Sequence, residues 1–531
     1  MSAAGRRGRA LGKGIGNALG HALAVRPWSG ALASGALLVV AARPWGTGWL
    51  ALVAFAPVLC ALRSQTSGAR AALMLAVTAS GAAVVVYEAL GPLTPALVPL
   101  LAAGATAPFA AAGALAPRLR RALGTRALLA TFPLLWLAAE ALPGRGWLLG
   151  PFATPLFAVG YSQAGLPAMH LARLGGVAAV GLAVLACNAL LVLAVVERAG
   201  WAWGALAALG AAVALTAFTA PASFEAHAAL VTPAALSTPA VAPGRVAAAA
   251  GEAEGGASGT VPARVAAVRV VQAALPDAAY AAAAALPAAR SALLRAIVAD
   301  ALAAPMPGGA GLTVAPEGAL PGPLPARGAS GLEPLLAGLG PALLGGPARV
   351  EGGIANAAFA WRSGKLERVY AKRRLAPITE ASLVPGRAPG LVAIGGVRVA
   401  PLICFEVAFP ELARRAAVGG AQLLAVLTND AFARYLDTPL QHLRMARFRA
   451  VETGRPLAFA SNAGPSAVVD GAGRVLARTA IGRPAAAVAT ARLEARPTPY
   501  LRWGDWPGTL ALVGSGLLAL VAGAKGGPPR P

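Results

Sequence analysis

The 531-residue chain contains little cysteine and little histidine. Its three cysteines are Cys60, Cys187 and Cys404, and only four histidines occur. No cysteine pair indicates a disulfide framework, and the histidines are too few and too dispersed for the ligand spacing of a zinc site. We therefore expect no disulfide, no bound metal and no cofactor.

Charged residues are also scarce, and acidic ones most of all. They make up 12% of the chain, with 45 Lys and Arg against 21 Asp and Glu, a formal net charge of +24. A basic chain can indicate nucleic acid as a partner, but the arginines are scattered through loops and no basic run is interleaved with aromatic residues. We expect no nucleic-acid partner, because membrane insertion and anionic lipids explain the charge more simply.

Long apolar runs are abundant instead. Hydrophobic residues make up 57% of the sequence, and the mean hydropathy is +0.66. These values predict a polytopic α-helical membrane protein of about eight spans. Seven spans are expected within a membrane domain over 28–220, and the last is expected at 507–524. The seven lie near 28–43, 47–62, 71–90, 94–115, 124–142, 174–196 and 201–220.

Basic residues predict the orientation of these spans. The N-terminal tail 1–27 carries Arg6, Arg7 and Arg9, and further arginines follow the second and fourth spans, whereas the connection between the third and fourth spans has none. Because cytoplasmic loops hold the excess of Lys and Arg, both this tail and the C-terminal tail 525–531 should be cytoplasmic. By parity, the segment between the seventh and eighth spans lies outside the cytoplasm.

That segment changes in character after a linker, rich in Ala, Pro and Gly, at 221–262. Residues 263–500 then predict an α/β domain in which strands alternate with helices. Ser363-Gly364 is typical of a hairpin turn between two strands, and an apolar strand leads into Cys404. The expected elements are strands at 263–272, 311–315, 357–370 (a hairpin), 397–403 and 422–428, and helices at 278–303, broken at Pro287, and 410–417.

Three polar residues fall at the ends of otherwise apolar strands: Glu317, Lys372 and Cys404. Taken singly, each such residue is more often solvated or packed than catalytic. Together they suit acyl transfer, because a carboxylate can accept the thiol proton, an ammonium can stabilise an oxyanion and a thiol can carry an acyl group as a thioester. Cys404 also precedes a helix that opens at Pro410, a position that we expect to favour the thiolate.

The residues around these three points resemble the nitrilase superfamily and, within it, the apolipoprotein N-acyltransferase family. The resemblance spans nearly the whole chain. It rests on Pro316-Glu317, Tyr370 and Lys372, Ile403-Cys404-Phe405-Glu406, Thr428-Asn429-Asp430-Ala431, Gln441-His442 and Arg449-Ala450-Val451-Glu452, and in the membrane part on Trp136, Glu140, Gly175-Gly176 and Asn188. It implies an αββα sandwich domain outside the bacterial inner membrane, facing the periplasm.

The resemblance also implies a ping-pong reaction. A membrane phospholipid would donate an acyl chain to Cys404, and the amine of a diacylated apolipoprotein would take it. Glu317 would be the general base, Lys372 the oxyanion stabiliser and Cys404 the nucleophile. Supporting residues would be Glu380, Glu406, Phe405 and Asn429, and the protein is expected to act as a monomer.

Some positions depart from the family pattern. Ala315 stands where the family commonly has Trp, and Phe405 replaces the Tyr that follows the nucleophile. We expect these changes to affect acyl-chain preference and rate more than the class of reaction. His442 is expected to be a packed or hydrogen-bonded residue, since Glu317 already supplies a base.

Two other functions remain open from the sequence. A membrane-anchored nitrilase-type amidase would hydrolyse a soluble amide, but it has less use for a platform of many spans. A non-catalytic membrane binding protein or transporter would explain the spans, but the sequence lacks the paired intramembrane charges of a coupled transporter.

Overall fold

The structure is a computed structural model that describes residues 26–87, 97–144, 155–219, 265–306, 311–325, 331–377, 379–431, 437–493 and 497–524. Nearly all of the expected N-terminal tail, the linker 221–262 and the C-terminal tail 525–531 lie outside these residues. The chain divides into two compact units, one built from 1–224, 435–438 and 498–531, the other from 225–434 and 439–497. Each unit is described by itself.

The first unit is helical and strongly apolar. Five of its described helical segments are long and apolar enough to cross a membrane, and two more are shorter. Pro108 and Pro117 lie within α6, and Pro133 within α7. Its main helices are α2 (Pro27–Ala42), α3 (Ala51–Ala54), α4 (Ala56–Leu62), α5 (Gly68–Tyr87), α6 (Leu97–Leu123), α7 (Thr125–Ala141), α9 (Ala172–Val195), α10 (Trp201–Phe218), α16 (Pro499–Trp503) and α17 (Trp506–Ala524).

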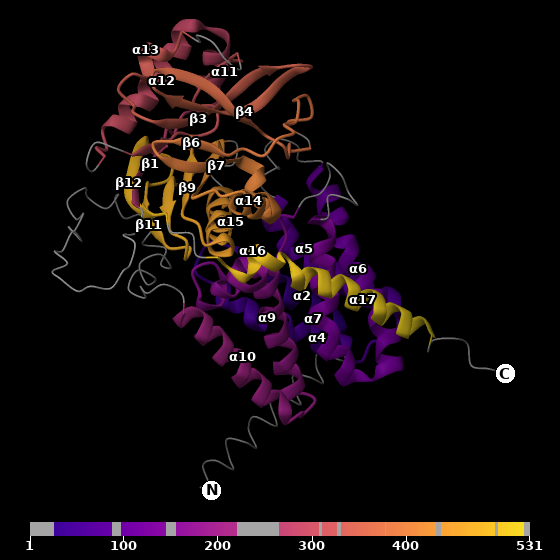
Figure 1. Cartoon of the computed structure of the whole chain (residues 1–531). Coiled ribbons are helices and arrows are strands. Elements are labelled where there is room, and N and C mark those ends of the chain that lie inside the picture. The colour runs from indigo at the N-terminus through magenta and orange to yellow at the C-terminus, as the bar shows by residue number, and fades with distance from the viewer. Residues whose placement is uncertain are drawn as a thin grey trace, which may run out of the picture. The chain divides into compact units, whose positions relative to one another are not determined.

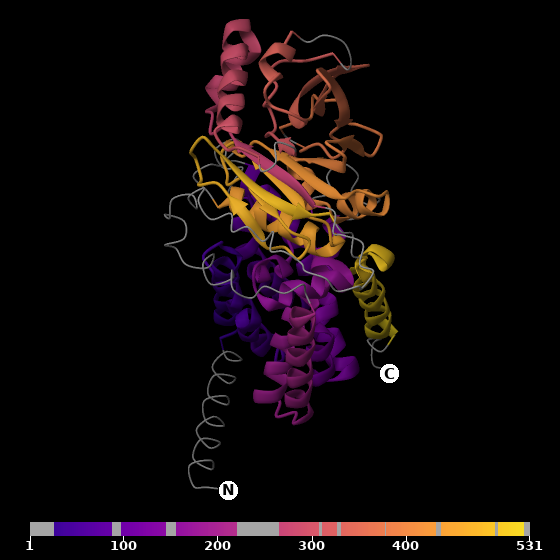
Figure 2. The same cartoon turned by 60° about the vertical axis from the view of Figure 1, so that its left-hand side comes forward.

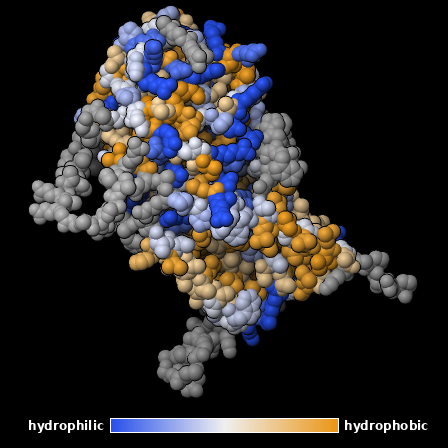
Figure 3. Space-filling view, viewed as in Figure 1, coloured by the Kyte–Doolittle hydropathy of each residue, from blue (hydrophilic) through white to orange (hydrophobic). Residues whose placement is uncertain are grey.

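Large apolar side chains face outward on these helices. On α17, Leu510, Val513, Leu517 and Leu520 are exposed, the last by 70%. The surface over this helix is mostly hydrophobic in Figure 3. Such a surface is costly in water and favourable in lipid. These helices therefore fit a membrane domain, while the expected number of eight spans stays a prediction.

The second unit contains two six-stranded sheets. The first has the strand order β12-β1-β2-β3-β4-β5 and the second β11-β10-β9-β8-β7-β6. In the first sheet, β2 lies parallel to both β1 and β3. In the second sheet, β7, β8 and β9 are parallel neighbours. The strands are β1 (Val265–Gln272), β2 (Leu312–Val314), β3 (Ala342–Val350), β4 (Gly353–Arg362), β5 (Lys365–Ala371), β6 (Val392–Ile394), β7 (Val397–Ile403), β8 (Leu423–Thr428), β9 (Leu457–Ser461), β10 (Ala467–Val469), β11 (Val475–Arg478) and β12 (Ala485–Arg492).

The sheets pack face to face, with helices outside. Apolar residues of both sheets share one core, which includes Val270 and Leu343 from the first sheet and Val399 and Leu427 from the second. Helices α11 (Asp277–Ala285) and α12 (Pro287–Leu302) cover the outer face of the first sheet. Helices α14 (Pro410–Val418) and α15 (Thr438–Thr453) lie beside the second sheet (Figures 1 and 2). This layering is the expected αββα sandwich.

The local predictions for this unit are confirmed where they were made. The helix breaks at Pro287, which begins α12, because proline lacks the amide hydrogen needed inside a helix. Ser363 and Gly364 join β4 to β5 with positive φ angles of 51° and 72°, as a tight hairpin turn requires. Helix α15 and the strands from β9 to β12 were not anticipated from the sequence.

Candidate active site

Parallel strands bring several predicted site residues to the same edges of the two sheets. Cys404 follows β7 and Asn429 follows β8, and these strands are paired up to Ile403 and Leu427. Glu317 lies three residues beyond the end of β2, and Lys372 directly follows β5. The carboxyl ends of parallel strands are a common place for functional side chains, because the loops there are free to vary.

Cys404 has an unusual backbone conformation. Its φ angle is +49°, in the left-handed region that residues other than glycine rarely adopt. The residue begins a short 3-10 helix, Cys404–Ala408, which separates the strand from α14. This sharp turn at the end of a strand resembles other strained positions that aim a nucleophile out of a sheet.

Glu317, Lys372 and Glu380 form one polar cluster. The Lys372 ammonium lies 2.8 Å from Glu380 Oε2 and 3.8 Å from Glu317 Oε1. Asn356 on β4 donates to both carboxylates, at 2.6 Å to Glu317 and 2.8 Å to Glu380. The backbone N–H of Asn429 donates to the other oxygen of Glu317 at 3.0 Å. Glu317 is thus held from two sides by hydrogen bonds, one to each of its oxygens.

Glu406 connects the turn at Cys404 to the segment after β5. Its carboxylate accepts hydrogen bonds from the Ile403 amide at 2.8 Å and from the Tyr370 hydroxyl at 2.7 Å. The same side chain accepts from the amides of Arg373 at 2.8 Å and Arg374 at 3.2 Å. Because Ile403 precedes the thiol and Arg373 follows the ammonium, Glu406 holds the two functional residues in register.

The electrostatics of the site correct one prediction. Burial, reinforced by Glu317, raises the pKa of the Cys404 thiol well above its ordinary value, although Lys372 acts in the opposite direction. The expectation of a resting thiolate is therefore wrong. That expectation considered only the helix that follows Cys404 and a neighbouring cation. The folded site also buries the sulfur among carboxylates, which disfavours the thiolate. A neutral thiol needs a base at the moment of attack.

Glu317 and Lys372 are suited to assist such a thiol. Burial raises the pKa of Glu317, and Lys372 only partly offsets this effect. A raised carboxyl pKa makes a stronger base at neutral pH. Burial alone would lower the pKa of Lys372, but negative charge on Cys404 when its thiol is ionised, and on Glu317 and Glu380, raises it above its ordinary value, so the ammonium stays charged. A charged ammonium can stabilise an oxyanion.

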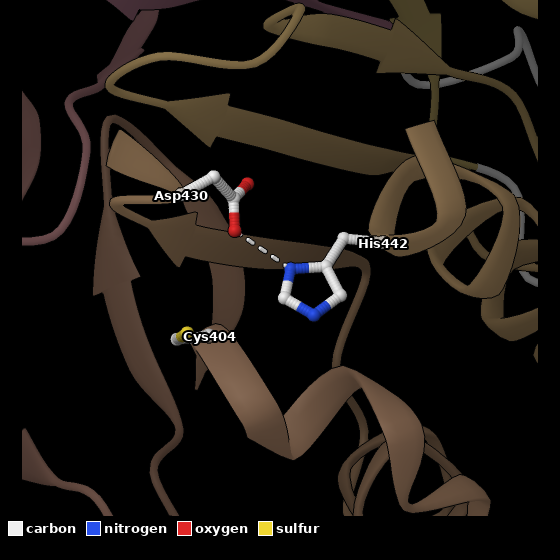
Figure 4. Close-up of side chains that lie close together, drawn as sticks. All are labelled: Cys404, Asp430 and His442. Atoms are coloured by element: carbon white, nitrogen blue, oxygen red, sulfur yellow. Dashed lines mark hydrogen bonds and ion pairs between the residues drawn. The ribbon is translucent and has the colours of Figure 1, made fainter. Parts of the chain in front are cut away.

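Asp430 and His442 were not predicted as site residues, yet they lie beside the thiol. His442 Nδ1 and Asp430 Oδ1 are 2.8 Å apart, as drawn in Figure 4. The Cys404 sulfur, one oxygen of Asp430 and one ring nitrogen of His442 all lie within 4.8 Å of one another. Three such donors could hold a thiophilic cation, although that would occupy the thiol. The expectation that His442 is hydrogen-bonded is met, and its closeness to Cys404 is new.

The remaining predicted residues lie around this cluster. Phe405 packs edge-on against Phe409, with ring centroids 5.1 Å apart. Ala315 is fully buried under the first sheet's helices. Asn429 accepts a hydrogen bond from Asn462 at 2.7 Å. Sequence reasoning missed Asn356, since a single Asn within a strand carries no motif.

The fold and this cluster define a nitrilase-type carbon–nitrogen hydrolase domain, and residues 264–496 match the family model "Carbon-nitrogen hydrolase". Residues 34–190 match the model "Apolipoprotein N-acyltransferase N-terminal domain". With both matches, the chain is similar to the apolipoprotein N-acyltransferases of the nitrilase superfamily, and its apolar helices fit a membrane protein.

Curated relatives agree over part of their length. An apolipoprotein N-acyltransferase of Shewanella oneidensis is 40% identical over 131 residues, which are 24% of this chain and 25% of that protein. One of Pseudomonas putida is 37% identical over 149 residues, 28% of this chain and 29% of that protein. The matched stretches thus span only between a quarter and a third of these relatives.

Solved structures of the nitrilase superfamily overlap with about half of the chain. An amidase of Nesterenkonia is 22% identical, with a TM-score of 0.32, and covers 45% of this chain and 93% of its own. Nit3 of Saccharomyces cerevisiae is 20% identical, with a TM-score of 0.34, and covers 47% and 97%. The fold assignment rests on the two sheets and the family match, since scores of this size do not establish a fold by themselves.

Proposed function

We propose that the protein is an N-acyltransferase that moves an acyl chain from a membrane phospholipid, through a thioester on Cys404, to the N-terminal amine of a diacylated apolipoprotein. The observation that supports the proposal is that the Cys404 thiol lies near enough to Glu317 and Lys372 for their charges to shift its pKa, in a chain that also has an apolar helical unit. Lipid substrates explain why a hydrolase-like fold is joined to membrane helices.

In the first half-reaction, Glu317 takes the proton of the Cys404 thiol as the sulfur attacks the ester carbonyl of the phospholipid. Lys372 stabilises the oxyanion that forms. When the intermediate collapses, the ester C–O bond breaks, Glu317 returns its proton to the leaving lysophospholipid oxygen, and a thioester remains. Glu380 and Asn356 keep Lys372 and Glu317 in place during these steps.

In the second half-reaction, the acceptor amine attacks the thioester carbonyl. An amide bond forms, the C–S bond breaks and the sulfur regains a proton. We propose the inner membrane of a bacterium as the location, with the α/β unit facing the periplasm, and the monomer as the active form. The basic residues that flank the predicted spans support this orientation.

The test uses purified full-length protein and a phospholipid labelled in its acyl chain. We expect label to stay on the protein, to be released by neutral hydroxylamine, and to be lost in Cys404→Ser. Equal labelling of Cys404→Ser would refute the role of this thiol. Cys187→Ser, which removes a cysteine from the helical unit, is the matched control and should label normally.

A nitrilase-type amidase is the second candidate, because the α/β unit matches the carbon–nitrogen hydrolase model. The two functions differ in what resolves the thioester. A diacylated lipopeptide with a free N-terminal amine should discharge the labelled enzyme and become labelled itself. Equal discharge by a lipopeptide with a blocked amine would favour hydrolysis.

A further inference from the structure

The ammonium group of the acceptor must lose one more proton than a single base can accept. Near neutral pH an α-amino group is largely protonated, since its pKa is about 7.7 to 8.0. Forming the amide removes two protons from this ammonium. One proton restores the Cys404 thiol, and the other must leave the site. Acylation has no such surplus, because the proton taken from the thiol goes to the leaving oxygen.

Glu317 is suited to one of these transfers only. It must be free of a proton when the nitrogen attacks, so that it can take the second proton and pass it to the sulfur. If Glu317 first deprotonated the ammonium, it would no longer be available as a base. When the acceptor arrives protonated, a second proton acceptor near the sulfur would therefore speed the second half-reaction.

His442 is placed for this task. It lies on α15, and a ring nitrogen of His442 lies within 4.8 Å of the Cys404 sulfur (Figure 4). Its Nδ1 bonds to Asp430, which in turn accepts from Thr428 at 2.9 Å and from Ser461 at 3.0 Å. A carboxylate held in this way fixes the tautomer and orientation of an imidazole.

Building on the proposed function, we propose that His442, oriented by Asp430, accepts the first proton of the acceptor's ammonium group, which leaves Glu317 free to accept the second. The N–H bond of the ammonium breaks, its electron pair stays on nitrogen, and the imidazole becomes imidazolium. The imidazolium then releases its proton to water.

The charges that face His442 suit this exchange. They are Asp430, Glu317 and Lys372, together with the Cys404 sulfur. Burial alone would lower the pKa of His442, but Asp430 outweighs burial and raises it above its ordinary value. A raised pKa makes the imidazole a stronger base toward an ammonium group.

The experiment isolates the second half-reaction. Full-length wild type and His442→Asn are first loaded with labelled acyl chain. Asn keeps an N–H donor near the position of Nδ1, so it can still bond to Asp430, but it cannot accept a proton. The loaded proteins are then chased at pH 7 and pH 9, either with a diacylated lipopeptide bearing a free amine or with hydroxylamine, which is largely uncharged at both values.

We expect discharge to the lipopeptide to be slower in His442→Asn by about fivefold or more at pH 7, where most of the amine is still protonated, and by less than about twofold at pH 9, where the amine has already lost its proton. Discharge to hydroxylamine should stay within about twofold of wild type at both values. His442→Gln, which also cannot accept a proton but does not place its amide at the position of Nδ1, is the second variant should His442→Asn not accumulate.

Two results would overturn the inference. One is equal slowing with both acceptors, which would indicate that His442 only supports the structure. The other is a rate of discharge to the lipopeptide in His442→Asn that matches wild type at pH 7. Failure of the proposed function itself would look different, because the wild-type protein would then form no acyl-enzyme or would not pass its label to the lipopeptide.

Discussion

At the scale of single residues, the thiol and its base are coupled. Cys404 is neutral at rest because burial and nearby carboxylates raise its pKa. A neutral thiol is a poor nucleophile, so the rate of acylation depends on a group that removes the proton during attack. Glu317, fixed by Asn356 and the Asn429 amide, is that group in our proposal.

We predict that Glu317→Gln slows acylation by about a hundredfold or more at pH 7. In wild type the base must be deprotonated, and burial raises the pKa of Glu317. The midpoint of the acid limb of the pH–rate profile should therefore lie above about 4.3, the ordinary pKa of a Glu side chain. In Glu317→Gln this limb should disappear. The remaining rate should rise with pH through the alkaline range, because the thiolate must then form unaided.

Single-turnover labelling from pH 5 to 10 measures both profiles. Glu367→Gln is a suitable control, since this carboxylate also lies on a strand of the α/β unit but is partly exposed, with 36% of its side chain accessible. It should leave the profile unchanged. A Glu317→Gln profile that keeps the wild-type acid limb would assign the base to another residue.

At the scale of elements, α15 supports the turn that carries Cys404. The fully buried guanidinium of Arg449 lies 2.8 Å from Glu452 and donates to the Val407 carbonyl at 3.1 Å. Val407 belongs to the short helix that begins at Cys404. The same helix α15 carries His442, so α15 both anchors the turn and supplies a polar side chain to the site.

We predict that Arg449→Met destabilises the protein by about 3 kcal/mol or more, because it leaves the Glu452 carboxylate buried without its partner. Thermal unfolding of the detergent-solubilised protein measures the loss. The double variant Arg449→Met, Glu452→Leu should recover most of it. Arg474→Met is the matched control, because its pair with Asp470 is partly exposed and should contribute less than about 1 kcal/mol. A double variant as unstable as Arg449→Met would contradict this explanation.

The sequence predicted those parts of the site that depend on local pattern. Apolar runs that end at Glu317, Lys372 and Cys404 indicate strand ends, and strand ends meet when strands are parallel. Asn356 and His442 gave no such signal, because one lies in the middle of a strand and the other inside a helix. Their importance depends on which residues face them across the fold. The resting state of Cys404 was mispredicted for the same reason, since burial is a non-local property.

At the scale of the whole molecule, charge and apolarity are distributed unevenly along the chain. Basic residues gather at ends of helices, such as Arg120 and Arg121 in the last turn of α6. Tryptophans at the start of α10, Trp201 and Trp203, are exposed by 57% and 55%. Aromatic residues of this kind favour the membrane interface, and basic residues favour its cytoplasmic side.

This distribution predicts the orientation of the chain, which fusions can test. A phosphatase that needs disulfides to be active works only outside the cytoplasm. Fused after Thr219, at the end of α10, it should be active, because seven spans with a cytoplasmic N-terminus place that point outside. Fused after residue 525, beyond α17, it should be inactive, while a reporter that works in the cytoplasm should be active there. Phosphatase activity at residue 525 would mean that the number of spans is odd or that the N-terminus is not cytoplasmic, and the α/β unit could then not be assigned to the periplasm by this parity.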